Sequence, residues 1–351
     1  MNYDYSELIP YLLHWYDRNA RILAWRENPK PYYVWVSEIM LQQTRVEAVK
    51  GYFDRFISEL PTIRDLAEAE EEKLLKLWEG LGYYNRVRNM QKAAKIVVEQ
   101  YDGELPADYE ALKRLPGIGT YTAGAVSSIA FGLPEPCVDG NVLRVLKRIA
   151  ASYDDITKEK VKKELEEDLR AIMPNDRPGD FNQSLMELGA TVCLPNGKPL
   201  CEECPVMHLC KAFHTGCETE LPVKAPKKER RVEEKTVFII KKDAGVSYEI
   251  ALHKRPKKGL LSGLWELPNV EGHLSCNEVQ EAFPNAEITR IPDGKHIFSH
   301  VEWRMWCYEI HLRNEILPES MKEEEKQFFT KETIERELSL PSAFDCCKKY
   351  I

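Results

Sequence analysis

The sequence predicts an all-helical domain followed by a small domain that mixes helices and strands (α plus α/β). Three observations support this fold class. From about residue 4 to 190, apolar residues recur at spacings of three and four, as in amphipathic helices. Residues 222–235 carry six basic residues and two prolines, as a linker does. After them the apolar residues alternate, as in strands. We therefore expect a helical domain at 1–217, a linker at 218–235 and a second domain at 236–351.

The elements of each domain follow from local signals. Pro and Gly punctuate the first part at intervals that suit short helices, as before Thr62 and before Ala107. In the second part, residues 235–242 and 248–255 have the alternation of strands, and residues 277–284 and 330–337 have the pattern of short helices. A length of 351 residues suits two domains of these sizes.

Composition excludes several classes of protein. Hydrophobic residues make up 43% of the chain and charged residues 30%, which is typical of globular proteins and not of disordered or collagen-like chains. The longest apolar stretch, residues 123–131, is far shorter than the ~20 residues of a membrane span. The first ten residues lack the basic start and apolar run of a signal peptide. We expect a cytoplasmic protein without membrane contact, whose 10 cysteines are thiols or metal ligands.

A net charge of −8 argues against a broad basic surface for nucleic acid. The segment from Leu112 to Ala123 offers another way to bind phosphate. It contains Leu-Pro-Gly-Ile-Gly between two helical patterns, and its glycines leave backbone amides accessible at the start of the second helix. This string is typical of a helix–hairpin–helix that grips a nucleic-acid backbone. We expect the amides of Gly117, Ile118 and Gly119 to contact DNA phosphates.

Four cysteines lie within 18 residues, with gaps of seven, two and five residues: Cys193, Cys201, Cys204 and Cys210. A single short segment with four thiolates can enclose one metal centre. Zinc sites usually pair two separated CxxC-type turns. The compact spacing therefore favours an iron–sulfur cluster, with zinc and unligated thiols as alternatives.

Two carboxylates stand out by their surroundings. Glu38 interrupts an apolar run, and Asp139 directly precedes a helical pattern. The structural interpretation of Glu38 is a residue in the first turn of a helix capped by Ser37, and that of Asp139 is a helix cap. The functional interpretation of Glu38 is a partly buried general acid with a raised pKa, which requires desolvation to outweigh the helix dipole.

Taken together, these motifs resemble the adenine DNA glycosylases of the MutY type. The resemblance covers nearly the whole chain through residues 24–49, 80–90, 115–126, 138–148, the four cysteines and residues 298–300. The first cysteine gap departs from it, with seven residues where six are usual. The resemblance implies a monomer that binds double-stranded DNA, flips out an adenine paired with 8-oxoguanine or guanine, and removes it. It also implies one 4Fe-4S cluster and admits a monovalent or divalent cation at the hairpin.

The resemblance also assigns roles to residues. Glu38 protonates adenine N7, and Asp139 stabilises the oxocarbenium-like sugar, by the two-carboxylate logic of glycoside cleavage. The assisting residues are Tyr121 and Asn141, the adenine pocket residues are Trp25, Arg26 and Val46, and the residues that wedge into the duplex are Gln43, Leu81 and Tyr83. Some members carry a pocket glutamate where this chain has Gln183.

The second domain resembles the Nudix-like 8-oxoguanine reader of the family, with Phe298, Ser299 and His300 as its sensing loop. No REUXEEXGU segment follows Gly263, so we expect binding without Nudix hydrolysis. The alternatives to an adenine glycosylase are an endonuclease III-like lyase, a non-catalytic iron–sulfur scaffold and a Nudix hydrolase. The lyases carry a Schiff-base lysine where this chain has Tyr121, and this favours a monofunctional enzyme.

Overall fold

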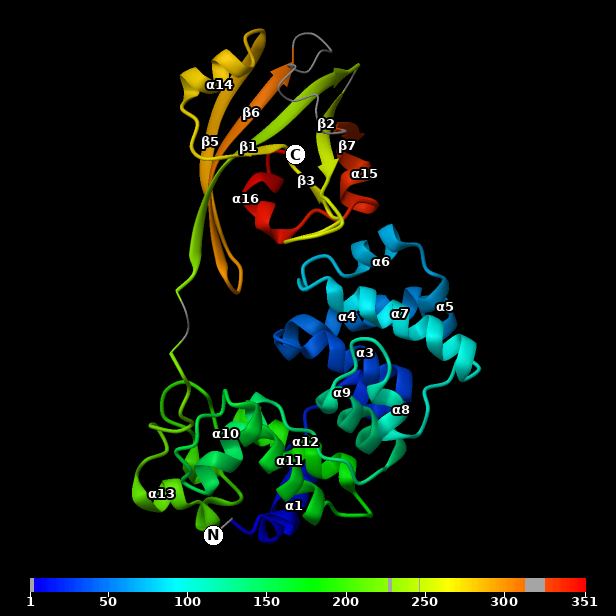
Figure 1. The fold of residues 1–351 in the computed structure, drawn as a ribbon, viewed down its shortest axis with the longest axis vertical. Helices are drawn as coiled ribbons and strands as arrows, with labels where there is room; N and C mark the ends of the chain where they lie inside the picture. Colours follow the sequence, from blue (N-terminus) through cyan, green and yellow to red (C-terminus); the bar gives the residue numbers. More distant parts are fainter. Residues whose placement is uncertain (1–2, 227–228, 246, 313–325) are drawn as a thin grey trace. The chain divides into compact units, whose positions relative to one another are not determined.

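The computed structural model describes residues 3–226, 229–245, 247–312 and 326–351 (Figure 1). The chain divides into two compact units. The first comprises Met1–Glu68 and Arg88–Pro226, and the second comprises Ala69–Val87 and Lys227–Ile351. Residues 69–87 thus group with the C-terminal strands, although they lie within the stretch predicted as one helical domain.

The first unit is helical. Its helices are α1 (Ile9–Asn19), α2 (Ala24–Glu27), α3 (Pro31–Leu41), α4 (Val46–Glu59), α5 (Ile63–Glu68), the greater part of α7 (Asn85–Gln100), α8 (Tyr109–Lys113), α9 (Thr120–Ala125), α10 (Gly140–Ile149), α11 (Glu159–Ile172), α12 (Pro178–Thr191) and α13 (Lys211–Thr215). Helix α9 continues into a π-helical turn at Val126–Ala130. The helical prediction for residues 4–190 is confirmed.

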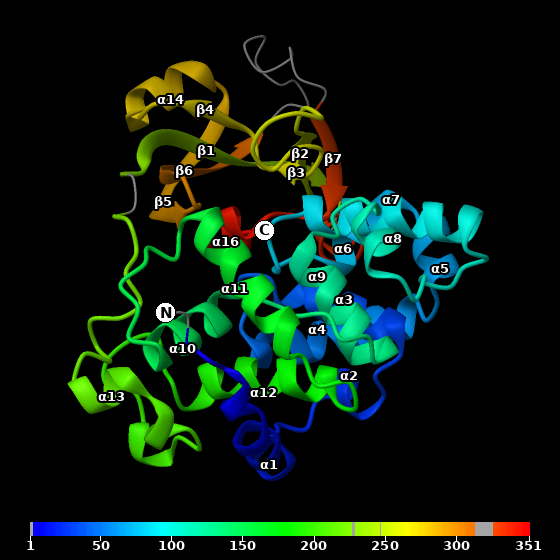
Figure 2. The ribbon, with the colours of Figure 1, turned by 60° about the horizontal axis from the view of Figure 1, so that its bottom comes forward.

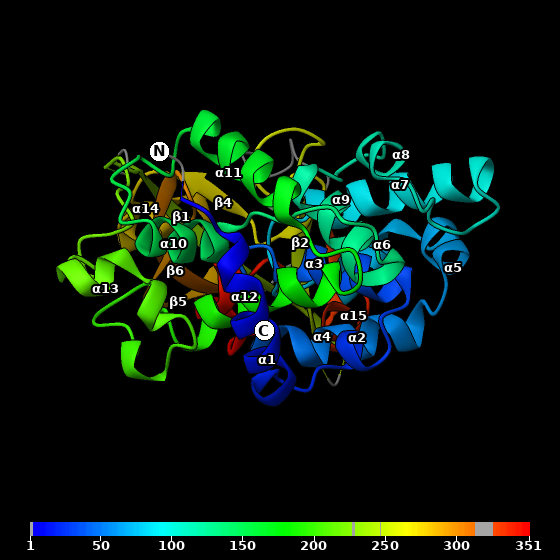
Figure 3. The same cartoon turned by 90° about the horizontal axis from the view of Figure 1, so that it is seen from below.

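Local signals set the ends of several of these helices. Pro31 and Pro178 occupy first-turn positions, where a missing N–H costs nothing. The side chains of Asp108 and Asp139 cap α8 and α10 by accepting from backbone amides. Helices α1 and α12 lie side by side and share one apolar core with α10 (Figures 2 and 3).

The second unit is a mixed sheet with helices on both faces. Its elements are α6 (Glu71–Leu77), β1 (Arg231–Ala244), β2 (Ser247–Lys254), β3 (Trp265–Glu266), β4 (Asn269–Glu271), α14 (Cys276–Ala282), β5 (Ala286–Ile297), β6 (Val301–Leu312), β7 (Lys326–Thr330), α15 (Lys331–Arg336) and α16 (Asp345–Lys348). The strand order is β3-β2-β1-β6-β5, with β4 paired to β1 and β7 paired to β2. Strands β1 and β6 run parallel, and the other pairs are antiparallel.

Alternation along β1 distributes its side chains between two cores. Val237 and Ile239 pack with residues of α15 and α16, whereas Phe238 and Ile240 pack with Val279 and other residues of α14 and β6. The predicted strands at 235–242 and 248–255 and the predicted helices at 277–284 and 330–337 are confirmed as β1, β2, α14 and α15. Strand β1 begins at Arg231, so the last five residues of the predicted linker belong to the sheet.

Residues 69–87 are held to the C-terminal strands and helices by polar contacts that local sequence patterns do not indicate. The Lys76 ammonium donates to the carbonyls of Leu338 (2.9 Å) and Ile334 (3.2 Å). Lys348 forms an ion pair with Glu79 at 3.0 Å. In the described part of the chain, every helix is too short or too polar to cross a membrane.

Candidate active site and metal centre

One cavity of the helical unit gathers most of the predicted site residues. It has a volume of about 660 Å³ and is lined from α2, α3, α4, α9, α10, α11 and α12 and from connecting segments. The predicted residues along its wall are Trp25, Arg26, Glu38, Gln43, Val46, Tyr121, Asp139 and Asn141. The cavity therefore brings together residues that lie more than a hundred positions apart in the chain.

Glu38 lies on the third turn of α3, which begins at Pro31. The Ser37 hydroxyl donates to the Val34 carbonyl inside the helix, so the capping interpretation of Ser37 and Glu38 is wrong. Glu38 is only 6% exposed. Burial raises its pKa to about 7, although the Tyr121 hydroxyl donates to its Oε2 at 2.6 Å and opposes the shift. Desolvation therefore dominates, as general-acid chemistry near neutral pH requires.

Asp139 caps α10 and also faces the cavity, so its two interpretations are compatible. Its Oδ1 accepts from the amides of Asn141 (2.9 Å) and Val142 (2.8 Å), and its Oδ2 accepts from the Asn141 side chain at 2.8 Å. Burial raises the pKa of Asp139, and these hydrogen bonds act against the rise. The carboxylate is thereby held in one orientation.

Hydrogen bonds continue from Asp139 to the cysteine segment. Asn141 accepts from Arg144 Nη2 at 2.9 Å, and Arg144 Nε donates to the carbonyl of Cys193 at 2.9 Å. Helices α10 and α12 approach closely here, because a Cβ on Gly189 would lie 2.6 Å from Asn141 Cβ. The carboxylate and the first cysteine are thus joined through two side chains.

Glu187 is a cavity residue that sequence reasoning missed. Its side chain is fully buried on α12 and accepts from Arg21 Nε (2.5 Å) and Arg26 Nη2 (2.8 Å). Burial opposes ionisation, but the two guanidinium groups lower the pKa of Glu187 below its usual value. A lone glutamate in the apolar pattern of residues 184–190 is the signal that could have found it. Gln183 also lines the cavity.

The four clustered cysteines line one small cavity between α10, α12 and the segment that carries them. Arg148 Nη1 donates to Cys193 Sγ at 3.3 Å, and backbone amides of Val206 and Phe213 donate to the sulfurs of Cys204 and Cys210. Among the described residues, no three of these four sulfurs lie within 4.8 Å of one another. The segment therefore has the donors of a metal centre, at a spacing wider than one ion requires.

The hairpin has the predicted helix–turn–helix form between α8 and α9. Gly117 uses its freedom with φ +79°, whereas Gly119 is extended (φ −90°) and caps α9. The Ile118 amide, one of the three predicted to contact phosphate, donates to the Leu115 carbonyl at 3.1 Å. Amides at Gly119 and in the first turn of α9 remain suited to that role.

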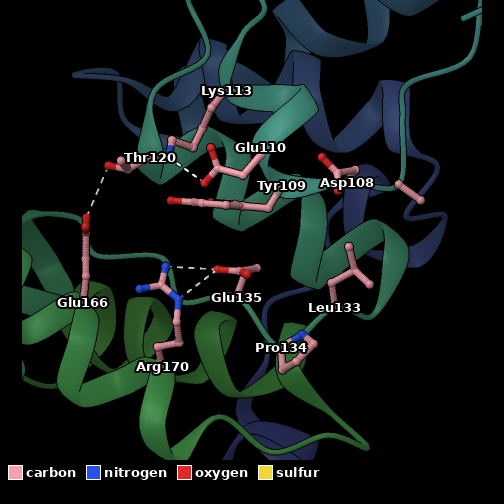
Figure 4. A pocket seen from close by; sticks show the side chains of 11 residues that line it. Asp108, Tyr109, Glu110, Lys113, Thr120, Leu133, Pro134, Glu135, Glu166 and Arg170 are labelled. Atoms are coloured by element: carbon pink, nitrogen blue, oxygen red, sulfur yellow. Dashed lines mark hydrogen bonds and ion pairs between the residues drawn. The ribbon is translucent and has the colours of Figure 1, made fainter.

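A second cavity, of about 560 Å³, lies next to this hairpin (Figure 4). Its charged side chains largely pair with one another: Arg170 with Glu135 at 3.0 Å, and Lys113 with Glu110 at 2.9 Å. Its lining includes none of the predicted catalytic residues. Its charges are therefore largely satisfied within the protein.

The predicted wedge residues belong to both units. Leu81 and Tyr83 lie in the second unit, where Leu81 is buried and Tyr83 is 50% exposed with a positive φ of 48°. Gln43 lies in the first unit and also has a positive φ, of 60°. Such strain in non-glycine residues is often found at functional sites.

The predicted sensing loop is the turn between β5 and β6. Phe298 packs on Trp303, whereas Ser299 and His300 are exposed. Ser299 Oγ lies 2.7 Å from Tyr83 Oη. The loop and one wedge residue therefore meet within the second unit.

Comparisons with known proteins fit this site. The HhH-GPD superfamily of base excision DNA repair proteins matches residues 36–171, and the NUDIX domain matches residues 236–349. A thermostable thymine-DNA glycosylase aligns with a TM-score of 0.54 and 29% identity, covering 60% of this chain and 96% of that one. An endonuclease III–DNA complex aligns with a TM-score of 0.52 and 27% identity, and the alignment covers 62% of this chain and 99% of that one. Fold and site define a helix–hairpin–helix base excision DNA glycosylase.

Curated relatives narrow the class. The adenine DNA glycosylases of Homo sapiens and Rattus norvegicus are each 36% identical to this protein, and each match covers 87% of this chain. The matches cover 67% of the human protein and 70% of the rat protein. The adenine DNA glycosylase of Mus musculus is 37% identical, and the match covers 86% of this chain and 70% of the mouse protein. The chain belongs to the adenine DNA glycosylase family. It is an N-glycosylase that acts on adenine in DNA.

Proposed function

We propose that this enzyme removes adenine that lies opposite 8-oxoguanine, and less readily opposite guanine, and leaves an abasic site without cutting the strand. One observation carries the proposal: a buried carboxyl, Glu38, and an oriented carboxylate, Asp139, face the same cavity. Glycoside cleavage needs this division between a proton donor and a charge stabiliser.

In the first step, a flipped adenine occupies the cavity and the protonated Glu38 carboxyl gives its proton to N7. Adenine that is not protonated would have to depart as an anion, which is a poor leaving group. Protonation at N7 therefore makes departure of the base feasible. A pKa of about 7 keeps a large share of Glu38 protonated at neutral pH. The Tyr121 hydroxyl holds the carboxyl in place through its 2.6 Å hydrogen bond.

As the bond breaks, positive charge develops on the deoxyribose. The Asp139 carboxylate stabilises it, and its three donors from Asn141 and Val142 keep it oriented toward the sugar. Water then adds to C1′ of the sugar and loses one proton, which the deprotonated Glu38 can accept, and an abasic site is left. Arg26, fixed by Glu187, supplies hydrogen-bond donors beside the base, and Trp25 supplies an apolar wall.

We also propose that Cys193, Cys201, Cys204 and Cys210 hold one 4Fe-4S cluster. A zinc ion with bonds of about 2.3 Å would draw its four sulfurs to roughly 3.8 Å from one another. The wider spacing of these sulfurs suits a cuboidal cluster with one thiolate on each iron. Amide and guanidinium donors to the sulfurs suit thiolates. When bound, the cluster cross-links the segment that carries it.

The reading of 8-oxoguanine is assigned to Ser299 and His300. Both are exposed at a turn, and Ser299 contacts the predicted wedge residue Tyr83. The lesion differs from guanine by a C8 carbonyl and a protonated N7, which hydroxyl and imidazole groups can recognise. The proximity of Ser299 and Tyr83 supports a common role at the lesion.

The experiment compares duplexes with adenine opposite 8-oxoguanine, guanine or thymine in single-turnover assays, with and without hot alkali. We expect strand breakage only after alkali, fastest opposite 8-oxoguanine and absent opposite thymine. Lys162 on α11 also lines the cavity, and its Nζ lies 3.7 Å from Glu166 Oε1. Because lyase chemistry needs an amine, Lys162 is the residue to test for it. Breakage without alkali that disappears in Lys162→Ala would overturn the monofunctional assignment.

A further inference from the structure

We propose that Cys307, Cys346 and Cys347 form a binding site for a single soft metal ion, with monovalent copper as its ligand. The three sulfurs all lie within 4.8 Å of one another. Cys347 Sγ lies 3.6 Å from Cys307 Sγ and 3.7 Å from Cys346 Sγ. Cys307 lies on β6 and the other two lie on α16, so only the tertiary structure brings the three together.

The spacing matches three thiolates around one ion. With metal–sulfur bonds of about 2.3 Å, three such sulfurs lie roughly 3.8–4.0 Å apart. The two separations from Cys347 need to change by only a few tenths of an ångström, and the third lies within 4.8 Å. Among the described residues, these three form the sole group of three or more Cys, His, Asp or Glu with all ligand atoms this close. The segment at 193–210, by contrast, holds its sulfurs wider apart.

The donor atoms of the three ligands favour a soft ion. The group contains no carboxylate and no imidazole, so its donors are all soft. Zinc sites are almost always four-coordinate, whereas three thiolates without a fourth protein ligand suit monovalent copper. The thioether-bearing side chain of Met305 adjoins the same place, because its Cε would lie 3.2 Å from a Cβ on Gly294.

The backbone around the three cysteines leaves space for the Cys346 side chain, and one of the three thiols is accessible to solvent. A Cβ on Gly294 would lie 2.3 Å from Cys346 Sγ, so the Cys346 side chain occupies the space that glycine leaves. Strand β5 is irregular between Ile291 and Gly294, opposite β6. Cys307 and Cys347 are fully buried in the apolar core, whereas Cys346 is partly exposed. An ion can therefore reach the thiols from the side of Cys346.

The test is anaerobic competition between the full-length protein and the chelator bicinchoninate for monovalent copper. We expect the wild type to bind one equivalent more than the variant C307S/C346S/C347S. The matched control, Cys276→Ser, changes an exposed thiol of the same unit and should bind like the wild type. Loss of one ligand in Cys346→Ser should weaken binding by more than the ~10–100-fold typical of outer-shell changes.

X-ray absorption of the copper-loaded wild type keeps the proposal testable if the triple variant fails to fold. We expect sulfur scatterers alone, at a coordination number that falls in Cys346→Ser. Equal copper uptake by the wild type and Cys346→Ser would overturn the proposal, as would nitrogen or oxygen ligands at the bound ion. This inference does not depend on the proposed base-excision chemistry, since no glycosylase activity is measured.

Discussion

At the scale of single residues, the proposed chemistry depends on how burial of Glu38 is balanced against its hydrogen bond from Tyr121. Burial favours the neutral acid, and the Tyr121 hydroxyl favours the anion. Burial prevails, so the group can donate a proton near pH 7. Asp139 is buried as well, but three donors counter its desolvation. Two carboxyl groups in one cavity thereby have different environments, as the proposed division between proton donor and charge stabiliser requires.

Replacing Glu38 by Gln should slow base excision by at least ~10²–10⁴-fold, because glutamine keeps the size and hydrogen bonding of the side chain but has no proton to transfer. Affinity for mismatched duplex should hold. Single-turnover rates on adenine opposite 8-oxoguanine, together with gel-shift affinities, measure both. Wild-type rates in the variant would return Glu38 to a structural role.

The same substitution should stabilise the fold in a pH-dependent way. The folded pKa of about 7 exceeds the ordinary 4.5, so the folded protein binds a proton more tightly than the unfolded chain. Wild-type stability should therefore fall as pH rises through this window, by up to roughly 3 kcal/mol. Calorimetry should show that Glu38→Gln melts higher than the wild type at pH 8 and almost level with it at pH 4. A gap that is equal at both pH values would contradict the raised pKa.

At the scale of elements, the two glycines of the hairpin differ in backbone conformation and in the space around them. Gly117 has a left-handed backbone and lies against Asn89, so a Cβ there would approach Asn89 Cβ to 2.8 Å. Gly119 has an extended backbone, and a Cβ there would meet no described atom within 4 Å. The first glycine serves the fold, and the second leaves room for a ligand.

We therefore expect Gly117→Ala to lower the free energy of unfolding by about 1–3 kcal/mol, through strain and crowding. Gly119→Ala should leave stability almost unchanged but weaken DNA binding, since the added methyl group lies where phosphate must approach. Denaturant unfolding and duplex affinity of the two variants, compared side by side, measure this. Full DNA affinity in a stable Gly119→Ala protein would show that phosphate binds elsewhere.

We expect the form of the cysteine segment to depend on the proposed 4Fe-4S cluster. Cys204→Ser should abolish visible absorbance and weaken DNA binding, because the segment loses its cross-link, while the chemistry of already bound substrate is less affected. Absorbance spectra, metal analysis and duplex affinity check this, with Cys276→Ser as the exposed control thiol. Stoichiometric zinc without iron in protein purified anaerobically would refute the iron–sulfur assignment.

At the scale of the whole molecule, the proposed function requires that adenine excision depend on the identity of the opposite base. Adenine is a normal base, so a safe enzyme has to read its partner. Glu38 and Asp139, the carboxyl groups proposed to be catalytic, belong to the helical unit, whereas the exposed loop at Phe298–His300 belongs to the unit of the sheet. Residues 69–87 belong to that second unit too, and they include Leu81 and Tyr83. The residues proposed for base removal and those proposed for reading the opposite base thus lie in different units.

Replacing Ser299 and His300 together by alanine should slow excision opposite 8-oxoguanine and hardly change it opposite guanine. Loss of such a readout contact typically costs ~1–3 kcal/mol of discrimination, so the ratio of the two rates should fall by ~5–150-fold. Single-turnover rates on the two duplexes measure the ratio, and Tyr83→Phe tests the contribution of the Tyr83–Ser299 contact. An unchanged ratio would place lesion sensing with Gln43, Leu81 and Tyr83.

The sequence by itself determined what depends on local signals. Alternation and helical spacing predicted the two kinds of domain, because each periodicity reports one buried face. The Leu-Pro-Gly-Ile-Gly string predicted the hairpin, since glycine freedom and helix capping are properties of neighbouring residues. Glu38 could be selected because a carboxyl group in apolar surroundings is unusual wherever it occurs. Asp139 was selected through the family resemblance, because by itself its position before a helix indicates only a cap.

Only the tertiary structure decided what depends on distant residues. The pKa of Glu38 follows from burial by several helices, and the ionised state of Glu187 follows from Arg21 and Arg26, more than 160 positions away. Residues 69–87 group with the sheet through Lys76 and Lys348, and three cysteines meet across β6 and α16. Desolvation and long-range contact depend on which atoms the fold brings together, and no local spacing contains that information.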